Sequence, residues 1–305
     1  MTAETESIIS LAKNKRNLKR KNTTQVLGYG LVWLCGIIAL AVVFWIIGYV
    51  LTQGLPVINL EFLTTRPAGG VSGEGGMSTT IVTTLYLVIL TIVIATPLGV
   101  GAAIYLVEYA DENSRGNKFL GLLVKAARTG VEILAGVPSI IFGLFGFALF
   151  VLYMKLGFSL LSASLSGAAL VLPTIIRTSE EALKTVPRSF REGSLSLGAT
   201  KWHTIFNVVL PTALPGIVTG IVLSVGRIIA ETAIFWVTLG GSYFLPETIM
   251  NSGRTMALHV YMLASETRAF DKAMGTASIL IITIILLNLG INLLSRRLTA
   301  RFTGK

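Results

Sequence analysis

The chain has 305 residues, of which 53% are hydrophobic and only 13% are charged. This composition is too apolar for a soluble domain, so the sequence indicates an integral membrane protein. The net charge of +10 does not indicate nucleic-acid binding, because the positive residues lie in short segments beside apolar runs and form no basic motif. The only cysteine, Cys35, excludes an intrachain disulfide and a cysteine-ligated metal cluster.

Six apolar runs are long enough to cross a bilayer, which predicts an all-α fold with six transmembrane helices. The first run follows a basic leader and is too long for the hydrophobic region of a cleaved signal peptide, so we expect it to be retained. The predicted spans are 26–51, 80–107, 135–153, 156–176, 213–240 and 273–294.

The lysines and arginines are distributed unequally between the connecting segments. If these segments alternate between the two sides of the membrane, one side receives 19 of them and the other receives 5. The positive-inside rule assigns the richer side, and with it both termini, to the cytoplasm. The predicted organisation is a cytoplasmic leader (1–25), a first helix with an external loop (26–78), a transmembrane domain (79–296) and a cytoplasmic tail (297–305).

The longest cytoplasmic loop, residues 177–211, contains signals of short surface helices. Gly198 is suited to close one such helix, and Thr200 to open the next. The serine and glycine content of the loop favours docking in a protein cleft over resting on lipid. Two hydroxyl and acid pairs have the spacing of a capping box, Thr178 with Glu181 and Ser189 with Glu192.

The end of this loop, "REGSLSLGATKWHTIFNVVLP" (191–211), resembles the cytoplasmic signature of ABC importer permeases. That signature is Glu-Ala-Ala, three residues, Gly, nine residues and Ile-x-Leu-Pro, and its spacing matches throughout. Gly193, in place of an alanine, should weaken the helix by up to about 1 kcal/mol. The resemblance implies a coupling helix that docks on a cytoplasmic ATPase, with these matching positions: Glu192, Gly193, Ser194, Gly198, Leu210 and Pro211.

Four further stretches are similar to the phosphate-specific ABC importer permeases of the PstA type. The resemblance extends over about residues 75–294 and implies half of a phosphate pathway. It also implies a second permease of the PstC type, two ATPase subunits, an extracytoplasmic phosphate-binding protein and no cofactor. The stretches are "PLGVGAAIYLVEYA" (97–110), "ILAGVPSIIFGLFGFAL" (133–149), "GRIIAETA" (226–233) and "SGRTMALHVYMLASE" (252–266).

Arg227 and Glu231 lie four residues apart in the otherwise apolar fifth run. In a continuous helix they share a face and can pair directly. A charge in the bilayer costs several kcal/mol or more unless it faces water or a partner, so we expect this face to point inward. One interpretation is an ion pair that joins two subunits. The other is a pathway site, in which the arginine binds phosphate and the carboxylate prevents permanent trapping of the anion.

Three more charged residues are candidates for the substrate pathway. Arg128 and Glu132 repeat the four-residue spacing at the start of the third span, where a surface pair with a snorkelling arginine is the alternative. Arg177 ends the fourth span and can meet the departing anion, although positive-inside anchoring explains it equally well. In the fifth span, Gly216, Gly220 and Ser224 recur every fourth residue, which predicts close helix packing.

The sequence argues against other classes of function. Its acids are dispersed and its two histidines, His203 and His259, lie in different loops, so no catalytic cluster forms and the chain is not predicted to be an enzyme. It has no phosphate-binding P-loop, so a partner must hydrolyse ATP. The alternatives kept open are a permease for sulfate or molybdate and, less favoured because no internal repeat is visible, an ion-coupled secondary transporter.

Overall fold

The computed structural model describes residues 2–68, 73–110 and 118–303 and divides into two compact units. The first unit, Met1–Thr52, is almost all of one helix, α1 (Thr2–Gly54). The predicted first span lies within α1, and Gln25–Val57 is long and apolar enough to cross a membrane. The helix begins upstream of that span, so the basic leader continues the same helix.

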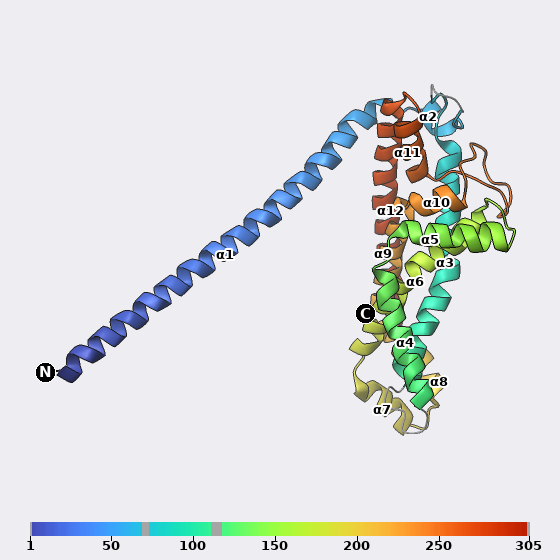
Figure 1. Ribbon diagram of the computed structural model, residues 1–305. Helices are drawn as coiled ribbons and strands as arrows, with labels where there is room; N and C mark the ends of the chain where they lie inside the picture. Colours follow the sequence, from blue (N-terminus) through green and yellow to red (C-terminus); the bar gives the residue numbers. More distant parts are fainter. Residues whose placement is uncertain (1, 69–72, 111–117, 304–305) are drawn as a thin grey trace. The chain divides into compact units, whose positions relative to one another are not determined.

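Four long helices of the second unit, Gln53–Lys305, lie side by side (Figure 1). Helix α3 packs against α6, α6 against α9, and α9 against α12. Their shared core is apolar and includes Leu87, Leu170, Ile175 and Ile228. The bounds are α3 (Ser78–Ile104), α6 (Leu160–Thr185), α9 (Leu210–Ala230) and α12 (Phe270–Thr303).

Short helices lie at both ends of this bundle (Figure 1). One end carries α2 (Leu60–Thr64) and α11 (Met256–Glu266), which meet in a small core of Phe62, Met77 and Met256. The other end carries α7 (Arg188–Ser196) and α8 (Lys201–Thr204). Single turns complete the chain path: η1 (Leu55–Val57), and the π-helical η2 (Tyr105–Tyr109) and η4 (Ile205–Val209).

The third predicted span, 135–153, is not one straight helix. Only its first residue, Ala135, belongs to α4 (Lys118–Ala135), a helix that begins in the predicted connecting segment, and most of the rest forms α5 (Ser139–Gly146), which continues as the π-helical η3 (Phe147–Tyr153). Helices α4 and α5 are bent by 108° at the break between them. Pro138 explains the break, because a proline disfavours helical backbone at the residue before it. Helix α5 therefore crosses the long helices, and its Gly143 lies against Ile234.

The fifth predicted span, 213–240, also breaks. Helix α9 ends at Ala230, and α10 (Ala233–Thr238) follows after two residues. Glu231 is extended there, with φ −75° and ψ 133°, and its Oε1 accepts hydrogen bonds from the amides of Ala233 (3.1 Å) and Ile234 (3.4 Å). The carboxylate thus caps α10, and the expectation that Arg227 and Glu231 share one continuous helix face is wrong.

The predicted loop 177–211 begins later than expected, because α6 continues to Thr185. Neither predicted capping box starts a helix: the Thr178 hydroxyl donates to the Thr174 carbonyl inside α6, and Ser189 lies within α7. The other two signals are confirmed. Thr200 caps α8 by accepting from the His203 amide at 3.3 Å, and Gly198 follows α7 with a φ of +86°.

The predicted all-α class is confirmed, since the described residues form helices and no named strand. Within the part of the chain that the structure describes, five helices are long and apolar enough to cross a membrane, and counting the bent pair α4 and α5 as one span gives six. The chain is therefore a multi-pass membrane protein.

Candidate functional site

A charged pocket of about 300 Å³ lies where α4, α6 and η2 meet, toward the end of the bundle that carries α7 and α8. Three basic and three acidic side chains line it together with two apolar residues. This composition is unusual for a surface between apolar helices, because charges near a bilayer need partners or water. The lining residues are Leu106, Arg128, Val131, Glu132, Arg177, Glu180, Glu181 and Lys184.

Glu180 lines this pocket and forms two of its ion pairs, and only 14% of its side chain is exposed. Its Oε1 is 2.7 Å from Lys184 Nζ and 3.5 Å from Arg128 Nε. Lys184 reaches it because residues four apart on a helix lie on the same face. Arg128 comes from α4 and also donates from Nη2 to the Leu106 carbonyl at 3.0 Å. The arginine thus joins α4, α6 and η2.

Arg177 has a looser position in the same pocket. Its Nε is 3.4 Å from Glu181 Oε1, and the two side chains are 61% and 66% exposed. An exposed ion pair of this kind contributes about 0–1 kcal/mol, so the guanidinium can exchange this partner for another anion at low cost.

The structure therefore brings together three of the five predicted pathway residues, Arg128, Glu132 and Arg177. Sequence reasoning missed Glu180 and Lys184, although the spacing of "RTSEEALK" over 177–184 contained the signal. Read as one helix face, positions 177, 180, 181 and 184 all point the same way. The loop boundary placed at residue 177 concealed this face.

Arg227 and Glu231 do not line this pocket. Arg227 is half-buried in the last turn of α9, and within the described residues its guanidinium has neither a hydrogen bond nor an ion pair. The predicted direct pairing with Glu231 is therefore absent from the part of the chain that the structure describes.

The register between α6 and α9 fixes the level of Arg227 along the bundle. Gly216 lies against Ala182 and Gly220 against Thr178, so the two helices are antiparallel and the predicted close packing is confirmed. Continuing this register places Arg227 level with Val171. At 1.5 Å per residue, Arg227 lies roughly 9 Å farther along the bundle than Arg177. The cations thus occupy two levels.

The predicted coupling positions lie together at the end of the bundle. Glu192, Gly193 and Gly198 are exposed, and Leu197 between them is 90% exposed. The Ser194 hydroxyl is 2.9 Å from the Thr204 hydroxyl, which holds α7 against α8. Leu210 and Pro211 open α9 directly after the π-helical η4, so Pro211 lies within a continuous helix and removes one of its backbone hydrogen bonds.

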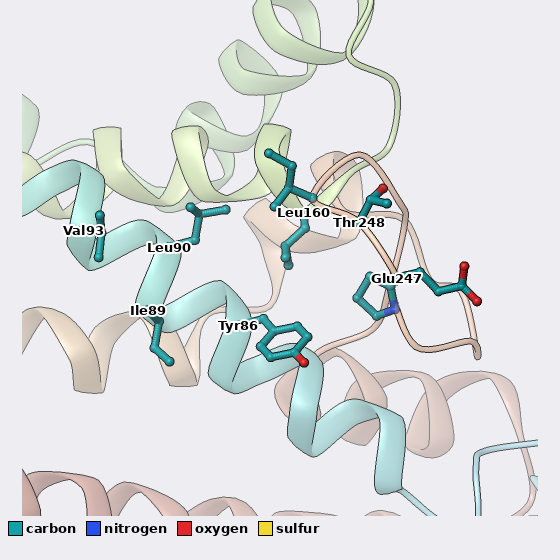
Figure 2. A pocket seen from close by; sticks show the side chains of 9 residues that line it. Tyr86, Ile89, Leu90, Val93, Leu160, Glu247 and Thr248 are labelled. Atoms are coloured by element: carbon teal, nitrogen blue, oxygen red, sulfur yellow. The ribbon is translucent and has the colours of Figure 1, made fainter.

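A second hollow, of about 340 Å³, lies between α3 and the loop 246–249 (Figure 2). Its walls are mainly apolar, with Leu90 of α3 and Leu160 of α6 bordering it. Glu247 is the one charged residue that lines it, and its carboxylate points away from α3. With no cation in its lining, this groove is a poor site for an anion.

Comparison with known proteins identifies the chain. Residues 95–304 match the family model described as "Binding-protein-dependent transport system inner membrane component". The chain is 28% identical over 300 residues to the "Probable ABC transporter permease protein YqgI" of Bacillus subtilis, covering 93% of this chain and 99% of the relative. It is 32% identical over 259 residues to the "Phosphate transport system permease protein PstA 1" of Mycobacterium tuberculosis, covering 83% and 82%.

A solved structure shows the same fold. The match is to a bacterial alginate ABC transporter in complex with an alginate pentasaccharide-bound periplasmic protein. The TM-score is 0.62 at 18% identity, and the match covers 88% of this chain and 95% of the other.

Proposed function

Because the chain belongs to the binding-protein-dependent transport system inner membrane components, we propose that it is the permease subunit of an ATP-driven importer of inorganic phosphate. Relatives of the PstA type support this substrate, because two of them are 32% and 30% identical to the chain over 83% and 86% of its length. The charged pocket and the two levels of cations supply the chemistry that a phosphate pathway needs.

The importer requires partners that this chain does not supply. ATP is hydrolysed by two separate ATPase subunits, and the exposed surface of α7 around Leu197 docks on one of them. The surplus of lysines and arginines supports a cytoplasmic location for this end of the bundle and for both termini. A second permease of the PstC type completes the pathway, and an extracytoplasmic binding protein delivers phosphate at the end with α2 and α11.

Transport follows from the balance of charges along the bundle. Arg227, with no partner of its own among the described residues, attracts the anion first, at the level farther from α7 and α8. The anion then reaches the pocket, where it displaces Glu181 from Arg177. The three carboxylates match the three cations in number, so the arginines return to their original partners once the anion leaves. The pocket therefore binds phosphate without trapping it.

The carboxylates also provide a basis for selectivity. Phosphate usually keeps a proton at neutral pH, whereas sulfate does not. A site that offers acceptors beside its cations favours the anion that can donate a hydrogen bond. In this pocket Glu181 is the acceptor beside Arg177 and Glu132 is a further carboxylate of the lining, whereas Glu180 is already occupied by Lys184 and Arg128.

The test is uptake by the complete complex in proteoliposomes. We expect ATP-dependent accumulation of phosphate that excess sulfate does not inhibit. Arg177→Gln should lower the rate at least tenfold, whereas Lys155→Gln, outside the pocket, serves as a control for the loss of one positive charge. ATP-dependent accumulation of sulfate or molybdate instead of phosphate would refute the substrate. Uptake that survives ATP depletion but stops with an uncoupler would refute the class of transporter.

A further inference from the structure

The π-helical turn η2 contacts three helices through three of its five residues. The Leu106 carbonyl accepts from Arg128 of α4, at the charged pocket. The Glu108 carboxylate binds Arg191 of α7. The Tyr109 ring lies 4.6 Å from Lys201 Nζ of α8, measured to its centroid. A π turn interrupts the regular hydrogen bonds of a helix and often occurs at functional sites. Here it lies between the coupling surface and the pocket.

Arg191 makes the most extensive of these contacts. Its Nε and Nη2 donate to Glu108 Oε1 at 3.0 and 2.8 Å, and the side chains are only 19% and 9% exposed. Its Nη1 and Nη2 also donate to the carbonyls of Val186 (2.7 Å) and Leu183 (2.9 Å). Those carbonyls belong to the C-terminus of α6, where helix carbonyls lack intrahelical partners and favour a cation. One guanidinium therefore fastens α7 to both α6 and η2.

Both anchors of Arg191 lead to the charged pocket. Helix α6 carries Glu180 one turn before Leu183, and η2 carries the carbonyl that positions Arg128. A displacement of α7 thus reaches Glu180 along α6 and Arg128 through η2. We propose that Arg191 and Glu108 are positioning residues that transmit movement of the coupling helix to the charged pocket. This inference rests on the proposed function, since it assumes that an ATPase docks on α7.

The test compares a graded series of variants in the complete importer, reconstituted with both permeases, the ATPase subunits and the binding protein. Arg191→Ala removes all four hydrogen bonds, and Glu108→Ala removes the two at the carboxylate. Arg191→Lys keeps the charge but loses the planar fork. Glu108→Gln keeps an acceptor oxygen. We expect the ratio of phosphate taken up to ATP hydrolysed to fall at least tenfold in both alanine variants and less in the conservative ones.

Arg188→Ala is the matched control, because Arg188 lies on the same helix, is exposed and lies outside the contacts of Arg191. It should keep the normal ratio. Equal loss in Arg188→Ala and Arg191→Ala would show a general effect of charge and overturn the proposal. So would an unchanged ratio in Arg191→Ala, or failure of the ATPase to copurify with that variant, which would indicate a docking role.

A second measurement does not depend on the substrate. A fluorophore is attached at Lys125→Cys, an exposed position of α4, in a chain that carries Cys35→Ser, with partner subunits free of reactive cysteines. ATP binding should change its emission in the parent chain and not in Arg191→Ala. A chain that shows this difference but moves no phosphate would refute the phosphate assignment and support the relay. A nucleotide response that persists in Arg191→Ala would overturn the relay.

Discussion

Gly220 of α9 lies so close to Thr178 of α6 that a methyl group at Gly220 would overlap the threonine hydroxyl. This contact holds together the helix that carries the charged pocket and the helix that carries Arg227. Close backbone approach between small residues is a usual way of packing helices in membranes, where the hydrophobic effect does not drive helices together.

Gly220→Ala should therefore destabilise the protein. Overpacking of this kind costs about 1–3 kcal/mol, which we expect to lower the thermal midpoint of the detergent-solubilised complex. Gly226→Ala is the matched control in the same helix, because an added carbon there meets nothing within 4 Å. Equal midpoints for the two variants would contradict the packing.

The two glycines of the coupling region should respond in opposite directions to alanine. Gly193 lies inside α7 with open space around it, so Gly193→Ala should stabilise that helix by up to about 1 kcal/mol. Gly198 has equally open space but a φ of +86°, which strains any other residue. Gly198→Ala should therefore lower stability and the amount of ATPase that copurifies. Equal effects of Gly193→Ala and Gly198→Ala on stability and on the amount of copurified ATPase would contradict this prediction.

We expect substitutions of Arg227 to affect transport and substitutions of Glu231 to affect stability. Arg227→Gln removes the cation and should reduce uptake at least tenfold while the complex still assembles, and Arg227→Lys should retain part of the rate. Glu231→Ala removes the cap of α10 and should cost about 0.5–2 kcal/mol in thermal stability, whereas Glu231→Gln keeps an acceptor and should cost less. Normal uptake by Arg227→Gln would return this arginine to a structural role.

His259, a buried residue of α11, makes the stability of the protein depend on pH. Burial, and then the charges of Arg254 and Lys272, lower the pKa of His259 from 6.5 to about 3. The folded chain thus keeps a neutral ring while the unfolded chain gains a proton below pH 6.5. The contribution of the neutral ring to stability is fully present above pH 6.5. Below it, the free energy of unfolding should fall by about 1.4 kcal/mol per pH unit as the pH drops toward 3.

Thermal unfolding between pH 7.5 and 5 measures this effect. His259→Gln removes the titrating ring and keeps an acceptor for Arg254, whose Nη1 is 3.4 Å from the ring Nδ1. The variant should show a flatter pH profile than the parent chain. Parallel profiles would mean that other groups cause the acid sensitivity.

The sequence predicted the parts of the fold that depend on composition and local chemistry. Apolar length located the spans, and Thr200 and Gly198 marked helix ends because capping depends on a few neighbouring residues. Pro138 is recognisable in the sequence as a residue that kinks a helix, but the break at Glu231 was missed, because it interrupts an apolar run whose hydropathy is continuous. A proline in such a run can kink a helix or end it, and tertiary contacts decide which.

The charged pocket was only partly predictable for a related reason. Arg128 and Arg177 were visible as charges beside apolar runs, but their partner Glu180 was assigned to a loop. Its role depends on α4 and α6 meeting, and no spacing within one segment reveals a contact between residues 52 positions apart. The same limit concealed the contact of Glu108 with Arg191.

The bent third span also has a consequence for synthesis of the chain. The glycines of α5 pack on residues made later: Gly143 lies against Ile234, and Gly146 against Ser166 and Thr238. At about 5–20 residues per second, the ribosome needs roughly 5–20 s to reach α10 after α5. During that interval α6, which supplies Ser166, can cover Gly146, but the residues of α10 that pack on Gly143 have not yet been made. The packing of the third span is therefore complete only after α10 has been made, and a chain truncated after α6 should be cleaved by membrane proteases faster than one truncated after α10.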